Sequence, residues 1–95
     1  MQMLDIPQDW LILKSELLEF ENNFDDSLLT EDLFQIRRDD FIIDSGWYQS
    51  QNAFITYLIL KSSWEEPIVK IRSFNIDECL NAIRLVILYA DTLRH

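Results

Sequence analysis

The fold is decided by residues 75–91, which read NIDECLNAIRLVILYAD. Apolar residues recur there every three or four positions, the spacing that lines one face of a helix. Asn75 is a residue type that caps a helix N-terminus, and Glu78 stands three positions later, where it can reach back to the cap. The segment therefore predicts a C-terminal helix. Its apolar face comprises Cys79, Leu80, Ile83, Val86, Ile87 and Ala90, flanked by Leu85, Leu88 and Tyr89.

Upstream of this helix, the pattern from Asp32 to Phe74 changes to short apolar runs typical of strands. The charged interval Arg37–Asp40 suits a turn or a strand edge, and Gln49–Asn52 is typical of a loop. Because the connections are too short for helical crossovers, the strands predict an antiparallel meander. The expected strands are Leu33–Ile36, Phe41–Ile43, Ala53–Lys61 and Ile68–Phe74.

The N-terminal segment, from about Gln8 to Asn23, has helical spacing as well. Pro7 is placed to sit in the first turn of such a helix, where its missing N–H is not needed. The apolar stripe of this predicted helix is Trp10, Leu13, Leu17, Phe20 and Phe24. Taken together, the pattern predicts a single α+β domain over residues 1–95. It consists of an antiparallel β-sheet meander of three to four strands, with an N-terminal and a C-terminal helix packed on one face.

Charge narrows the class of partner. The chain of 95 residues carries 8 Lys and Arg against 17 Asp and Glu, a formal net charge of −9, and most of the acids lie in residues 1–44. We expect no nucleic-acid partner and no membrane partner, because phosphate backbones and anionic lipid surfaces are bound through Lys and Arg. A field of this sign attracts a basic protein.

The single cysteine rules out an internal disulfide and suits a reducing compartment. The first residues lack the basic start and apolar run of a secretory signal. We therefore expect a cytoplasmic protein.

Residues for catalysis or for cofactor binding are scarce. The lone histidine is the terminal His95, so a Ser-His or Cys-His pair would have to use it, and one Cys plus one His cannot form a zinc site. With one glycine the chain has no glycine-rich phosphate loop. We expect no enzyme activity, no cofactor and no metal. The adjacent carboxylate pairs Asp25-Asp26, Glu31-Asp32, Asp39-Asp40 and Glu65-Glu66 are expected to be solvated.

Three aromatic residues lie near the predicted connections. Trp47 and Trp64 are expected to close the ends of a small core, although contact with a partner is the alternative for both. Tyr48 suits a half-exposed position, where its ring could contact a partner.

The second half of the chain resembles small acidic bacterial immunity proteins of toxin/immunity systems, of the contact-dependent growth inhibition type. The resemblance rests on Asp44-Ser45-Gly46-Trp47-Tyr48, the strand that follows it, Trp64-Glu65-Glu66-Pro67 and the capped helix from Asn75. It implies a protein that binds a toxin domain and blocks its active site or the access of its substrate. It does not indicate which toxin is bound.

The resulting hypothesis is an immunity protein that neutralises a basic toxin domain, such as a nuclease, by placing carboxylates where the toxin expects phosphates. We expect it to act as a monomer. The alternative is a small acidic secretion chaperone or adaptor that works as a homodimer. The candidate partner-binding residues are Glu16, Glu19, Glu21, Asp25, Asp26, Glu31, Asp32, Asp39, Asp40 and Tyr48.

Overall fold

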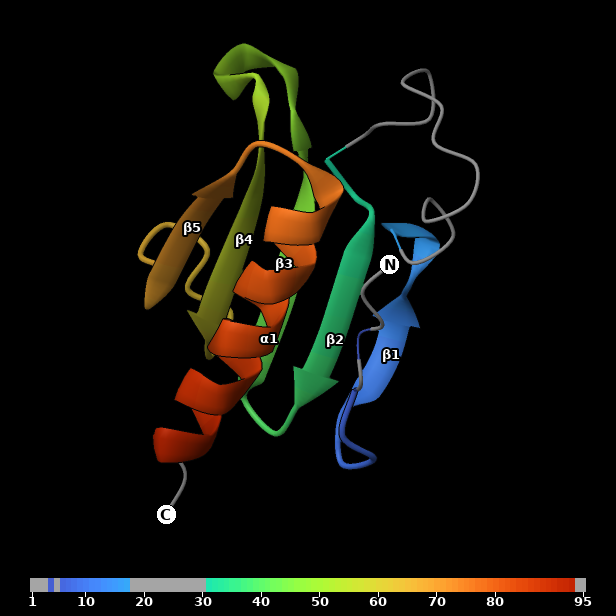
Figure 1. Cartoon of the computed structure of the whole chain (residues 1–95). Coiled ribbons are helices and arrows are strands. Elements are labelled where there is room, and N and C mark those ends of the chain that lie inside the picture. Colours follow the sequence, from blue (N-terminus) through green and yellow to red (C-terminus); the bar gives the residue numbers. More distant parts are fainter. Residues whose placement is uncertain (1–3, 5, 18–30, 94–95) are drawn as a thin grey trace.

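A computed structural model describes residues 4, 6–17 and 31–93 of the chain. These residues form one five-stranded sheet in the order β1-β2-β3-β4-β5, with every neighbouring pair antiparallel. A single long helix, α1, lies across one face of this sheet and packs on β3, β4 and β5 (Figure 1). The elements are β1 (Leu11–Lys14), β2 (Phe34–Arg38), β3 (Phe41–Tyr48), β4 (Ala53–Leu60), β5 (Val69–Ser73) and α1 (Ile76–Thr92).

The hairpin of β3 and β4 forms the centre of the sheet. The two strands pair along their whole length, from Phe41 opposite Leu60 to Tyr48 opposite Ala53. A 3₁₀ turn at Gln49–Gln51 connects them, followed by Asn52 at φ 50°, a left-handed conformation that asparagine tolerates well. The predicted loop at Gln49–Asn52 is confirmed.

The core lies between this sheet and α1. Because side chains alternate between the two faces of a strand, the register places Phe34, Ile36, Ile43, Phe54 and Leu58 together on the face that α1 covers. All five are at most 2% exposed. The helix contributes Cys79, Leu80, Ile83, Val86, Ile87 and Ala90 to the same cluster, the face expected from the sequence.

The predicted C-terminal helix is confirmed, including its cap. Asn75 Oδ1 accepts a hydrogen bond of 2.8 Å from the Glu78 amide. The Glu78 carboxylate accepts one of 2.9 Å from the amide of Phe74, the residue before the cap, so it reaches back one position further than a standard capping box. Two donors at the helix N-terminus are thereby satisfied. Leu85, Leu88 and Tyr89 stay exposed on the outer face of α1.

The predicted N-terminal helix is wrong over the residues that the structure describes. Leu11–Lys14 forms the edge strand β1, and its pairing with β2 places Leu11 opposite Arg37 and Ile12 opposite Ile36. Tertiary pairing overrides the helical spacing here, because the short apolar run Leu11–Leu13 fits a strand edge equally well. The rest of that predicted helix, residues 18–23, lies outside the described residues. With β1 the sheet has five strands, whereas three or four were expected.

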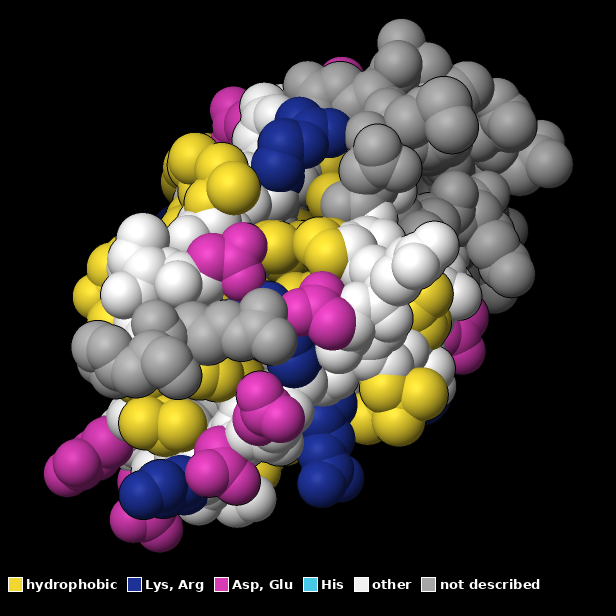
Figure 2. Space-filling view, turned by 90° about the horizontal axis from the view of Figure 1, so that it is seen from below, with side chains coloured by type: hydrophobic (Ala, Val, Ile, Leu, Met, Phe, Trp, Pro, Cys, Tyr) yellow, Lys and Arg dark blue, Asp and Glu magenta, His cyan; other side chains and the backbone are white. Residues whose placement is uncertain are grey.

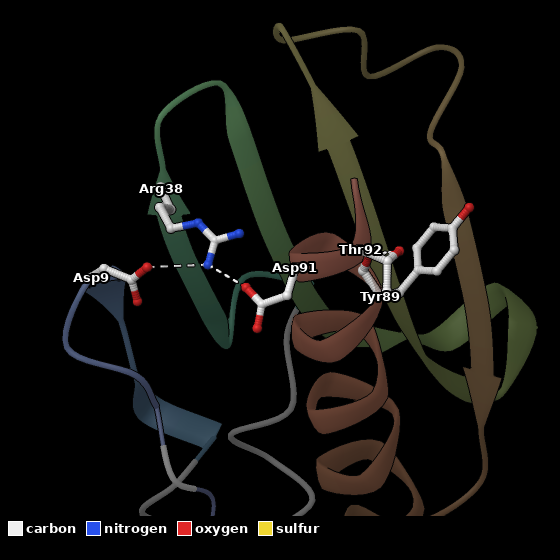
Figure 3. Close-up of polar contacts among 5 residues, drawn as sticks. All are labelled: Asp9, Arg38, Tyr89, Asp91 and Thr92. Carbon is white, nitrogen blue, oxygen red and sulfur yellow. Dashed lines mark hydrogen bonds and ion pairs between the residues drawn. The ribbon is translucent and has the colours of Figure 1, made fainter. Parts of the chain in front are cut away.

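Arg38, expected in a turn or strand edge, is instead a buried junction in the structure. Its side chain is 4% exposed, and Nη1 donates to Asp9 at 3.3 Å and to Asp91 at 2.7 Å (Figure 3). The Trp10 ring lies 4.5 Å from the guanidinium carbon, within cation–π range. Arg38 therefore joins the N-terminal segment, β2 and the last turn of α1.

Candidate functional site

The sheet face opposite α1 carries a polar row across its middle. Gln35, Asp44, Tyr57 and Lys70 are direct neighbours on β2, β3, β4 and β5. Gln35 Nε2 donates a hydrogen bond of 2.9 Å to Asp44 Oδ2. Tyr48, further along β3, meets the Tyr57 ring edge-on at 6.1 Å between centroids. Two tyrosines and a largely buried carboxylate thus share one face.

Gly46 leaves room for the backbone at Glu31 to cross this face. It stands between Asp44 and Tyr48 on β3, and a side chain there would collide with the backbone carbonyl of Glu31. Because Gly46 has no side chain, the backbone of Glu31 packs directly against β3. The glycine of the Asp-Ser-Gly-Trp-Tyr motif therefore brings the acidic pair Glu31-Asp32 beside Tyr48.

The pKa of Tyr48 depends on the same group of residues. The pKa of Tyr48 is raised to about 12, mainly by burial and in smaller part by Asp44, Tyr57, Glu31 and Asp32. A negative charge within electrostatic range disfavours ionisation of the phenol, and burial is the larger cause. We call Glu16, Glu31, Asp32, Asp44 and Tyr48 the Tyr48 face.

Burial also raises the pKa of Asp44, opposed by the hydrogen bond from Gln35 and assisted by the charge of Asp32. Lys14 binds Asp32 at 2.6 Å. That hydrogen bond is the main cause that raises the pKa of Lys14, and the charges of Asp32 and Glu16 add to it. Glu16 therefore lies near Lys14 and Asp32. Within this group, Asp32 already forms a salt bridge with Lys14.

The structure separates the predicted acidic residues into two regions. It brings Glu16, Glu31, Asp32 and Tyr48 together at one end of β2, whereas Asp39 and Asp40 form the β2–β3 turn at its other end. A strand of this length spans roughly 17 Å, so the two groups do not form one patch. Figure 2, a view from the end of the molecule opposite the Tyr48 face, shows acidic side chains mixed with basic and apolar ones. The remaining predicted residues, Glu19, Glu21, Asp25 and Asp26, lie outside the described residues.

Sequence reasoning missed Asp44, Gln35 and Tyr57 as members of this face. Strand alternation was the available signal: residues 44, 46 and 48 must point to one side of β3. The burial of Asp44 could not be predicted from the sequence, because it depends on tertiary structure, in which Gln35 and Tyr57 are its neighbours on the adjacent strands.

The two tryptophans differ. Trp47 packs edge-on against Phe54 with ring centroids 5.1 Å apart and adjoins the core, as expected. The expectation that Trp64 also closes the core is wrong, because its side chain is 49% exposed. It stands in the β4–β5 connection, where Lys61 and Ser62 adopt left-handed conformations and direct the chain outward.

Cys79 is confirmed as a core residue. It is fully buried, with its sulfur 3.0 Å from the hydroxyl of Ser45 and 3.9 Å from that of Thr56. Burial raises the pKa of the thiol, which these two hydrogen bonds lower only in part. The thiolate form that nucleophilic chemistry requires is therefore disfavoured.

Within the described residues, no three His, Cys, Asp or Glu side chains are grouped so that they could hold a metal ion. Nor does that part of the chain contain a helix with the length and apolarity of a membrane span. Comparison of the chain with protein-family models, with curated proteins and with solved structures gives no match.

Proposed function

We propose that this protein is an immunity protein that binds a basic toxin domain through the Tyr48 face and blocks its active site or the access of its substrate. The observation that carries the proposal is the convergence of Glu31 and Asp32 on Tyr48, made possible by the bare backbone at Gly46. Carboxylates around a half-buried aromatic ring are suited to bind an electropositive surface, because charge steers the encounter and the ring anchors it.

In the proposed mechanism the chain does no chemistry. Exposed Glu16, Glu31 and Asp32 occupy positions where a toxin such as a nuclease would hold substrate phosphates. Tyr48 fixes the orientation, and its neutral hydroxyl at ordinary pH donates or accepts a hydrogen bond at the interface. The net charge of −9 adds a long-range attraction for a basic domain.

The resemblance to contact-dependent growth inhibition immunity proteins supports the proposal. Its first motif lies on β3, where Gly46 has the structural role described above. Its second motif, Trp64-Glu65-Glu66-Pro67, lies in an exposed connection and not in the core. The second motif and the Tyr48 end of the first thus lie where a partner could reach them, whereas Asp44, Ser45 and Gly46 are buried.

The test uses the C-terminal domain of the protein encoded immediately upstream as the candidate toxin. Association rates are measured by stopped flow at low and at high salt. We expect Glu31→Gln/Asp32→Asn to slow association at low salt by about tenfold, with the difference shrinking at high salt.

The matched control is Asp39→Asn/Asp40→Asn, which removes the same charge at the other end of β2. Asn suits the left-handed backbone of Asp39 at φ 54°. Equal effects of the two double variants would reject the Tyr48 face as the contact surface. An absence of binding to any basic domain would reject the function.

One observation favours the alternative of a homodimeric secretion chaperone. The outer face of α1 exposes Leu85, Leu88 and Tyr89 by 60%, 58% and 44%. Side chains at this spacing form a stripe that a second helix could cover. Sedimentation equilibrium distinguishes the two: the immunity proposal expects the 11.4 kDa monomer. A dimer that Leu85→Gln/Leu88→Gln dissociates would favour the chaperone.

A further inference from the structure

The connection between β4 and β5 forms a cavity that the proposed function does not use. It has a volume of about 370 Å³ and is lined by Ser62, Ser63, Trp64, Glu65 and Glu66. The connection leaves β4 after Leu60, at the end of the strand opposite to the Tyr48 face (Figure 1). Lys61 N donates to the carbonyl of Asp40 at 2.9 Å, so the connection begins beside the β2–β3 turn.

Trp64 supplies the aromatic wall of this cavity. Its side chain is 49% exposed, whereas Trp10 is buried and Trp47 packs on Phe54. Leaving half of an indole in water forgoes a large part of the burial that usually stabilises tryptophan. An indole ring is also the best aromatic acceptor for a cation placed over its face.

The charge of the cavity is negative. Glu65 and Glu66 line it, and neither forms a salt bridge with a lysine or arginine in the part of the chain that the structure describes. Asp39 and Asp40, in the adjoining turn, have the same sign. Two uncompensated carboxylates beside an accessible indole are complementary to a cation with a flat, partly apolar body.

We propose that this cavity binds the guanidinium group of an arginine side chain on a partner protein. Arginine fits better than lysine, because its planar head stacks on an indole and its paired N–H groups match a carboxylate. Ser62 and Ser63 offer hydroxyl acceptors to the remaining N–H groups. The site is independent of the Tyr48 face, since it uses other residues.

The test is a titration of the whole chain with Nα-acetyl-arginine amide, followed through the indole N–H signal of Trp64 in a ¹H–¹⁵N spectrum. We expect a saturable shift with a dissociation constant on the order of 1 mM, and binding of the uncharged Nα-acetyl-norleucine amide at least about tenfold weaker. A linear, non-saturating response to the arginine compound, or equal responses to both compounds, would overturn the proposal.

Variants identify the groups that act. Trp64→Leu keeps an apolar side chain but removes the π face, and its titration is followed at the Ser63 amide. We expect it, and separately Glu65→Gln/Glu66→Gln, to weaken binding of the arginine compound about tenfold. The control Asp77→Asn removes a carboxylate at the N-terminus of α1 and should leave binding unchanged. An effect of the control equal to that of the glutamate variant would mean that only net charge acts, which also overturns the site.

The source of the guanidinium is tested with free L-arginine. Its zwitterionic α-carbon groups add no net charge and have no counterpart in a protein side chain, so it should bind no more tightly than the blocked compound. Tighter binding of the free amino acid would mean that the ligand is a small metabolite and not the side chain of a partner protein. Because no toxin takes part, these results do not depend on the proposed function.

Discussion

Arg38 Nη1 donates a hydrogen bond of 2.7 Å to Asp91 Oδ1, across 53 positions of sequence. The contact joins the end of β2 to the last turn of α1, while Asp9 and the Trp10 ring approach the same guanidinium from the N-terminal segment. Nearby, the Thr92 hydroxyl donates to the carbonyl of Tyr89 and closes the end of the helix (Figure 3). A buried cation therefore holds three separate parts of the chain together.

Replacing Asp91 tests how much this junction stabilises the fold. We expect Asp91→Asn to lower the free energy of unfolding by about 1 kcal/mol, because a hydrogen bond to a charged group is weakened while the half-exposed carboxylate limits the loss. Urea denaturation measures the change. Asp40→Asn, in an exposed turn, should stay within about 0.5 kcal/mol of the native chain. Equal stability of Asp91→Asn and the native protein would show that Asp9 alone compensates Arg38.

Gly46→Ala tests the close approach of Glu31 to β3. The added methyl group would overlap the Glu31 carbonyl, so the backbone at Glu31 must move. We expect a loss of about 2–3 kcal/mol in urea denaturation, typical of overpacking against backbone. Ser50→Ala in the exposed 3₁₀ turn is the control. A Gly46→Ala protein as stable as the native one would contradict the packing described here.

The phenol of Tyr48 reports the position of the acidic pair. Its pKa of about 12 should appear as a late phase in a spectrophotometric titration at alkaline pH, and Tyr48→Phe should remove that phase. In Glu31→Gln/Asp32→Asn, two of the charges that oppose ionisation are gone, so the phase should move to lower pH. If it stays in place, the two carboxylates do not lie near Tyr48.

Asp44 predicts a pH dependence of stability. The folded state raises its pKa above the ordinary value of 3.8, so the folded chain binds a proton more tightly than the unfolded chain. Stability is therefore lost as the pH rises from 3.8 through the folded pKa, and the cost is fully present above that folded pKa. We expect Asp44→Asn, which can still accept from Gln35, to raise the melting temperature at pH 7.

The gain from Asp44→Asn should disappear once the pH falls below 3.8, where the native carboxyl is protonated in both states. Melting curves of the two proteins from pH 3 to 7 provide the measurement. A gain that is constant over this range would mean that the charge of Asp44 is not its cause.

Much of the architecture is local and could be read from the chain. Asn75, Glu78 and the apolar spacing after them specify α1, because capping and helical periodicity are properties of neighbouring residues. The same holds for the turn at Asn52. The N-terminal segment could not be assigned in this way. Its apolar residues fit a helix and a strand, and the pairing of Leu11 and Ile12 with β2 decided between them.

The sequence by itself determined the acidity of the chain, the C-terminal helix and the antiparallel connectivity of the strands, since each depends on composition or on short-range pattern. Only the tertiary structure decided which acids meet. The backbone of Glu31 packs on β3 because Gly46 has no side chain, whereas Asp39 and Asp40 stay at the far end of β2. The burial of Arg38 was settled in the same way, because it depends on Asp9 and Asp91, which lie far from it in the chain.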